Sequence, residues 1–210
     1  MKAIIFDFDG TLADTIPNIV HSFSEVFNKY DGADLSREEI IGMFGPSETE
    51  IIEQNLKSDQ KKEAKEDYFK EYEDRHAEFI QKNEEIKDVL RKLQERDIKL
   101  GVVTGKSKRG LSITLKELGM ESFFQAVVTG DDVDQPKPSP EGIEMALKEL
   151  QTAKSETIYA GDSDSDIKAG IKAGLKTCGV KWLPNTETSE FEHTPDIILE
   201  NTSDWEKLLA

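Results

Sequence analysis

Near the amino terminus stands the stretch KAIIFDFDGT (residues 2–11), in which a run of apolar β-formers leads into two carboxylates, a glycine and a threonine. A continuous apolar run of this length is typical of a strand buried on both faces of a sheet. The two-residue period of a strand points Asp7 and Asp9 to one side and Phe8 to the other. Gly10 permits a sharp turn after the strand. We therefore predict a strand over Lys2–Phe8 with paired carboxylates at its end.

Five further apolar runs have the same character. They are Lys99–Thr104, Ala126–Thr129, Thr157–Ala160, Thr177–Val180 and Asp196–Leu199. Stretches with helical periodicity separate them, at Glu84–Arg96, Leu111–Leu118, Glu141–Leu150 and Ile167–Ala173. Alternation of strands and helices predicts an α/β fold with a doubly wound, mostly parallel sheet.

The segment Thr15–Lys82 interrupts this alternation, because it contains helical patterns and no strand pattern. Thr15 is a candidate helix cap, with Pro17 in the first turn of the helix that follows. Residues 57–78 include 14 charged residues out of 22, which indicates a solvated helix surface. The predicted organisation is an α/β core formed by residues 1–14 and 83–210, with an inserted α-helical cap domain at residues 15–82.

Composition narrows the class of protein. The chain has 210 residues, with 27 Lys and Arg against 43 Asp and Glu, for a net charge of −16. This charge argues against nucleic acid or an anionic membrane as a partner. No apolar run approaches the roughly 18 residues of a membrane span, and the single Cys178 excludes an internal disulfide. We expect a cytoplasmic monomer or homodimer that acts on a small molecule.

Polar segments follow three of the other predicted strands: Thr104-Gly105-Lys106, Lys137-Pro138 and the run GDSDSD at residues 161–166. In a parallel sheet the carboxyl ends of the strands share one crevice. The GDSDSD run does not fit a calcium-binding EF-hand loop, which needs Gly and Glu where Ile167 and Ala173 stand. A magnesium site at the strand ends remains, with Asp162 reaching a metal held near Asp7 and Asp9. Asp166, one helical turn on, suits a supporting role.

Taken together, these segments resemble the four motifs of the haloacid dehalogenase-like (HAD) hydrolase superfamily: DFDGT (7–11), VVTG (102–105), KPSP (137–140) and GDSDSD (161–166). The helical insertion resembles the type with an α-helical cap. FGPSE (44–48) is similar to a cap segment of phosphoglycolate phosphatases and their pyrophosphatase-like relatives. Two departures are the missing Pro-Gly around residues 80–83 and Gly105-Lys106 in place of Asn-Lys after Thr104. We expect neither to touch the chemistry.

The resemblance implies a role for each motif. Asp7 would be the nucleophile and would form an aspartyl-phosphate, while Asp9 would act as general acid and base. Mg²⁺ would be bound by Asp7, the backbone carbonyl of Asp9 and Asp162. Substrate phosphoryl oxygens would contact Thr104, Gly105 and Lys137, with the Thr11 hydroxyl as a further candidate. In the cap, Ser47 and Glu48 are candidates for substrate contact or equally for helix capping. For Arg75 and His76 a position at the mouth of the active site stays open, but surface positions are expected.

The expected function is a Mg²⁺-dependent phosphatase, a phosphoric monoester hydrolase acting on a phosphoglycolate-like ester or on pyrophosphate. Two alternatives stay open. A phosphomutase of the same fold, similar to β-phosphoglucomutase, would return the phosphoryl group to a sugar. A non-enzymatic phospho-acceptor module would keep it on aspartate, but receiver domains of that kind phosphorylate the third strand and lack a large insertion after the first.

Overall fold

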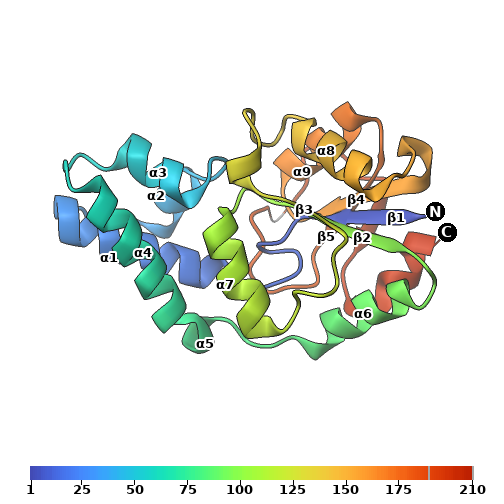
Figure 1. The fold of residues 1–210 in the computed structure, drawn as a ribbon, viewed down its shortest axis with the longest axis horizontal. Coiled ribbons are helices and arrows are strands. Elements are labelled where there is room, and N and C mark those ends of the chain that lie inside the picture. Colours follow the sequence, from blue (N-terminus) through green and yellow to red (C-terminus); the bar gives the residue numbers. More distant parts are fainter. Residues whose placement is uncertain (189, 210) are drawn as a thin grey trace.

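The centre of the molecule is a six-stranded sheet in the order β3-β2-β1-β4-β5-β6, and every neighbouring pair is parallel. The computed structural model describes residues 1–188 and 190–209 (Figure 1). The strands are β1 Ala3–Phe6, β2 Lys99–Val103, β3 Ala126–Val128, β4 Thr157–Gly161, β5 Lys176–Val180 and β6 Ile197–Leu199. All six predicted strands are present, with ends shifted by one or two residues, and the predicted fold class is confirmed.

Helices cover both faces of the sheet. They are α6 Glu84–Gln94, α7 Lys108–Leu118, α8 Glu141–Leu150 and α9 Asp164–Ala173, with 3₁₀ turns η1 Gly130–Asp132, η2 Lys154–Glu156 and η3 Thr202–Leu209. Within β1, Ile4 and Phe6 pack into the cluster that includes α6, α7 and η3, whereas Ala3 and Ile5 pack towards α8 and α9. This alternation follows from the two-residue period of a strand, and it buries β1 completely.

Burial on both faces does not extend to the edges of the sheet. Val127 in β3 is 38% exposed and Ile198 in β6 is 40% exposed. Each of these strands has one neighbour, so the sequence pattern overstated their burial. The central strand β1, which carries the candidate site at its end, is paired on both sides.

Residues between β1 and α6 form five helices, which we call the cap helices: α1 Ile16–Asp31, α2 Arg37–Ile41, α3 Glu48–Asn55, α4 Lys61–Asp74 and α5 His76–Phe79. They lie at the end of the molecule opposite the two termini (Figure 1). The rings of Phe23 in α1 and Tyr68 in α4 lie 4.5 Å apart between their centroids and help to hold the pair of helices together. The buried side of α4 is formed by Ala64, Tyr68, Phe69 and Tyr72, so its many charges face solvent.

The start of α1 differs from the prediction. Thr15 occupies the position before the helix, but its side chain makes no capping hydrogen bond. Its hydroxyl donates instead to Oδ1 of Asp9. A residue expected to serve local helix formation therefore holds a carboxylate of the candidate site. Within the described ranges, no helix is long and apolar enough to cross a membrane.

Candidate active site

The paired carboxylates lie immediately after β1. The backbone N–H of Asp7 donates to the carbonyl of Ala160 at 2.8 Å, which continues the pairing with β4. Gly10 has a φ of +75°, and a Cβ there would lie 2.3 Å from Oδ2 of Asp162. Only glycine satisfies both the backbone conformation and the close approach. The turn thus brings Asp7, Asp9 and Asp162 together from two neighbouring strands.

Lys137 connects the nucleophile candidate to the first turn of α9. Its Nζ lies 2.7 Å from Oδ1 of Asp7 and 2.7 Å from Oδ1 of Asp166. Burial disfavours the ammonium, but the carboxylates of Asp166 and Asp7 outweigh this effect and raise the pKa of Lys137 well above its usual range. Lys137 is therefore charged at neutral pH and neutralises part of the acidic cluster.

Asp166 is fully buried, and its oxygens are occupied by hydrogen bonds. Oδ1 accepts from Lys137 and from the Tyr159 hydroxyl at 3.0 Å. Oδ2 accepts from the Ser163 hydroxyl at 2.5 Å and from its N–H at 3.1 Å. This arrangement suits the supporting role predicted for Asp166, because it fixes the position of Lys137.

The donor set fits a magnesium ion. Carboxylate oxygens of Asp7, Asp162 and Asp166 lie within 4.8 Å of one another. Burial raises the pKa of Asp7 and of Asp162 well above the usual range, and repulsion from neighbouring carboxylates adds to the effect at both. Such an excess of buried negative charge, presented entirely by oxygen ligands, is the environment that a hard divalent cation offsets. Since four hydrogen bonds already occupy the two oxygens of Asp166, Asp7 and Asp162 are the carboxylates that would hold the ion.

The side chain of Thr11 supports Asp162. Its hydroxyl donates to Oδ1 of Asp162 at 2.9 Å and is fully buried. The sequence placed Thr11 among the candidates for substrate contact, and in the structure its hydroxyl donates to Asp162, a candidate metal ligand. Thr104 ends β2, and its Oγ1 accepts from the Lys106 N–H at 3.1 Å, which shapes the turn carrying Gly105.

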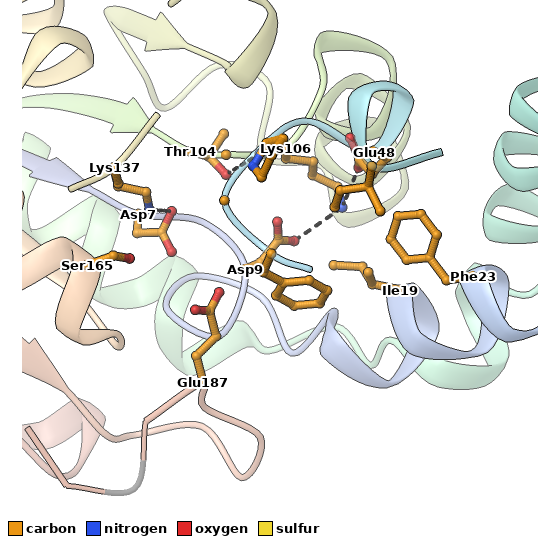
Figure 2. Close-up of a pocket in the computed structure, with 15 residues that line it drawn as sticks. Asp7, Asp9, Ile19, Phe23, Glu48, Thr104, Lys106, Lys137, Ser165 and Glu187 are labelled. Atoms are coloured by element: carbon orange, nitrogen blue, oxygen red, sulfur yellow. Dashed lines mark hydrogen bonds and ion pairs between the residues drawn. The ribbon is translucent and has the colours of Figure 1, made fainter. Parts of the chain in front are cut away.

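Some of these residues line a cavity of about 110 Å³ between the sheet edge and the cap helices (Figure 2). The sheet side contributes the polar groups of Asp7, Asp9, Thr104 and Lys137. The cap side contributes mainly apolar groups, from Ile19, Phe23, Phe44, Pro46 and Ile51. A charged phosphoryl group would therefore be bound against the sheet and its leaving group against the cap.

Two charged residues of the cavity were not predicted as site residues. Lys106, which we expected to lie outside the chemistry, has a completely buried side chain with Nζ 3.3 Å from Oδ1 of Asp9. Glu187 enters from the loop after β5 (Figure 2). Its backbone N–H donates to Oδ2 of Asp162 at 2.7 Å. Burial, followed by the carboxylates of Asp166 and Asp7, raises the pKa of Glu187 to about 8. Lys106 comes directly after the VVTG motif (102–105), which was a signal for its place near the site. Glu187 belongs to no motif.

The cap candidates occupy different environments. Glu48 lines the cavity, while Ser47 precedes α3, with its N–H donating to Glu50 and its hydroxyl 3.1 Å from that of Thr49. Arg75 is exposed and pairs with carboxylates of its own segment. His76 was expected at the surface but is 3% exposed, and its ring lies nearly perpendicular to that of Tyr72.

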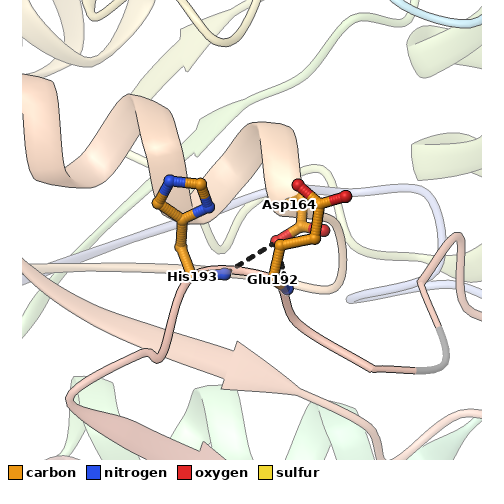
Figure 3. A group of neighbouring side chains, drawn as sticks. All are labelled: Asp164, Glu192 and His193. Atoms are coloured by element: carbon orange, nitrogen blue, oxygen red, sulfur yellow. Dashed lines mark hydrogen bonds between the residues drawn. The ribbon is translucent and has the colours of Figure 1, made fainter.

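A second group of possible ligands, Asp164, Glu192 and His193, lies at the start of α9 (Figure 3). Oδ1 of Asp164 accepts the backbone N–H groups of Glu192 at 2.9 Å and of His193 at 3.3 Å. These bonds tie a surface loop to the helix and account for the grouping without a metal.

A parallel sheet with an acidic pair after its first strand, a buried lysine against one of the pair and a helical cover define a hydrolase built for phosphoryl chemistry. A profile of the haloacid dehalogenase-like hydrolase family matches residues 4–180. The chain belongs to this family.

Individual proteins agree with the assignment. The chain is 36% identical over 208 residues to pyrophosphatase PpaX of Bacillus pumilus, covering 97% of this chain and 94% of the relative. The crystal structure of CbbY from Rhodobacter sphaeroides in complex with phosphate has a TM-score of 0.82 and 26% identity, with 97% of this chain and 96% of CbbY covered. A predicted phosphoglycolate phosphatase from Haemophilus somnus has a TM-score of 0.84 at 21% identity, covering 100% and 98%, and shows the shared fold. The relatives support a phosphatase.

Proposed function

We propose that this protein is a Mg²⁺-dependent phosphatase that cleaves pyrophosphate, or a phosphate ester of similar size, through an aspartyl-phosphate on Asp7. The observation that carries the proposal is the ion pair between Asp7 and Lys137 at the polar wall of the cavity. It presents a carboxylate oxygen beside a fixed positive charge, where a phosphoryl group would acquire negative charge during transfer.

In the first step an oxygen of Asp7 bonds to phosphorus while the bond from phosphorus to the leaving oxygen breaks. Asp9 donates a proton to that leaving oxygen. In the second step Asp9 takes a proton from water, the water oxygen bonds to phosphorus, and the Asp7 carboxylate is released. Lys137, Thr104 and the Gly105 N–H orient the phosphoryl oxygens throughout. A magnesium ion held by Asp7, the Asp9 carbonyl and Asp162 would supply charge neutralisation for the phosphoryl group.

Pyrophosphate is the first substrate to test, because the full-length relative at 36% identity is a pyrophosphatase. The small cavity supports a compact substrate such as pyrophosphate or phosphoglycolate rather than a phosphoprotein. The cap segment at residues 44–48 contributes Phe44, Pro46 and Glu48 to the cavity wall, so we propose that leaving-group preference depends on this segment.

The test is kcat/KM with Mg²⁺ on pyrophosphate, phosphoglycolate, simple alkyl phosphates and hexose phosphates. The proposal predicts release of inorganic phosphate, with the highest kcat/KM on pyrophosphate or phosphoglycolate. A hexose bisphosphate product would support the phosphomutase alternative. Phospho-Asp7 that persists without turnover would support the phospho-acceptor alternative.

A further inference from the structure

Lys106 carries a buried ammonium between two carboxylates from different parts of the molecule. Its Nζ lies 3.3 Å from Oδ1 of Asp9, after β1, and 3.3 Å from Oε1 of Glu48, at the start of α3 (Figure 2). On a third side it lies 4.5 Å from the ring centroid of Tyr72. Among the described residues, Nζ and Oε1 of Glu48 have no partner in hydrogen-bond geometry. Charge attraction between cap and core therefore holds this ammonium in place.

Glu48 sits in a recess at the start of α7 in the core. Its Oε2 accepts the backbone N–H of Ser107 at 2.5 Å. Gly110, in the first turn of α7, has no side chain, and Oε1 of Glu48 fills the space beside it. A Cβ on Gly110 would lie 2.4 Å from this oxygen. Cap and core also come close to each other beside this recess, since a Cβ on Gly105 would lie 3.1 Å from the carbonyl oxygen of Gly45. The core surface is therefore shaped to receive this segment of the cap.

Asp9 is oriented by contacts to one of its two oxygens. Oδ1 accepts from the Thr15 hydroxyl and faces the Lys106 ammonium. Asp9 also lines the cavity. Fixing Oδ1 in this way leaves Oδ2 as the oxygen that proton transfer to a leaving group would use.

We propose that Lys106 is a positioning residue for Asp9, and that Glu48 sets the position of Lys106 only while the cap is seated on the core. The inference rests on the phosphatase function proposed above. With Glu48 in its recess, the ammonium is held between two carboxylates and Asp9 points into the cavity. When the cap moves away, Lys106 loses one of its two anionic partners, and the orientation of Asp9 is no longer constrained from the cap side. The general acid is thereby aligned in the closed enzyme, from which water is excluded.

The first test replaces Lys106 by Met and compares substrates with different leaving groups. A misaligned general acid slows poor leaving groups most, because these need the proton. We expect kcat on an alkyl phosphate to fall about 100-fold and kcat on 4-nitrophenyl phosphate less than about tenfold, with KM within about threefold. The control is Arg109→Met, which removes an exposed cation that pairs with Glu66 of α4 across the same boundary at 2.8 Å. It should leave the leaving-group dependence unchanged.

The second test keeps every charge, because Lys106→Met leaves the carboxylates of Asp9 and Glu48 without their cation, and this loss can unfold the protein. Gly110→Ala places a methyl group where Glu48 sits. We expect faster hydrogen exchange at the Ser107 amide and the same bias against poor leaving groups, in weaker form. Ser112→Ala is the matched control, since Ser112 lies on the same helix with an exposed side chain.

Failures of the two proposals are distinguishable. A wild-type chain that releases phosphate from no substrate contradicts the proposed function. An active wild-type chain whose Lys106→Met variant loses the same fraction of kcat on every substrate, or only gains in KM, overturns the positioning role. Unchanged exchange at Ser107 in Gly110→Ala overturns the role of the cap.

Discussion

The two walls of the cavity differ in chemical character and in the way they are built. The sheet wall consists of charged and polar groups at the ends of hydrogen-bonded strands, with Asp7 tied to β4 and Lys137 tied to Asp166. The cap wall consists mainly of aliphatic and aromatic groups on α1, α3 and the loop before α3. A rigid polar wall suits a group common to all substrates, the phosphoryl group. The leaving group differs between substrates, and an apolar wall on separate helices suits it. The same apolar wall excludes water from the cavity.

Asp7→Asn should have the largest effect, because it changes the sheet wall at the attacking atom. The amide has nearly the same shape but cannot attack phosphorus as an anion, so we expect kcat below about 1% of wild type on every substrate. The melting temperature should not fall, because burial already disfavours the Asp7 charge. Steady-state phosphate release and thermal unfolding measure the two outcomes. Asp59→Asn, on the exposed surface, is the control.

Removal of metal tests the sheet wall without mutation. A chelator should abolish activity, and Mg²⁺ should restore it. Ca²⁺ should not restore activity, because it takes more oxygen ligands at longer distances than Mg²⁺ does. It would bind both carboxylate oxygens of Asp7 and so occupy the oxygen that attacks phosphorus. Titration of each ion into metal-free protein, followed by phosphate release, is the measurement. Full activity in excess chelator would contradict the metal site.

Phe44→Ala changes the cap wall alone and should alter preference rather than chemistry. Loss of the ring removes contact with a large apolar leaving group, so we expect kcat/KM for an aryl phosphate to fall about tenfold. The value for pyrophosphate should change less than about threefold. Equal losses on both substrates would mean that the cap wall serves only to exclude water.

Glu187→Gln should have the smallest effect, on stability of the metal-free protein. The pKa of Glu187 is raised from 4.5 to about 8, so folding favours its protonated form. Its contribution to stability is present below about pH 4.5 and is lost as pH rises through about 8. The variant should therefore melt roughly 2–4 °C higher than wild type at pH 8.5 and at the same temperature near pH 4.5. Added Mg²⁺ should reduce the difference at pH 8.5, and an equal difference at both pH values would rule out the charge as its cause.

Much of the sheet wall was predictable from sequence. The six strands, their parallel arrangement and the convergence of Asp7, Asp9, Asp162, Lys137 and Asp166 were all anticipated, and the structure brings these residues together. The reason is that each motif follows directly from a strand, and parallel strands end at the same edge of a sheet. The cap wall was less predictable, since helical patterns indicate which residues are apolar but not what they face.

Particular residues show where local patterns stop. Thr15 and Pro17 have the local features of a helix start, yet the Thr15 hydroxyl bonds to Asp9. Thr11 belongs to a phosphatase motif, yet its hydroxyl holds Asp162, 151 positions away. Glu187 lies in a loop without a motif and reaches the cavity because the chain after β5 passes beside Asp162.

By itself the sequence determined the succession of strands and helices along the chain of the α/β core, the turn after β1 and the family of the protein. These features depend on short-range patterns: the period of a strand, the freedom of Gly10 and the spacing of motifs. Only the tertiary structure decided that Lys106 lies between Asp9 and Glu48 and that Gly110 leaves room for the Glu48 carboxylate. The contacts of Glu48 join segments about 60 residues apart across the boundary of cap and core, where the electrostatic energy depends on distances and burial that no local pattern contains.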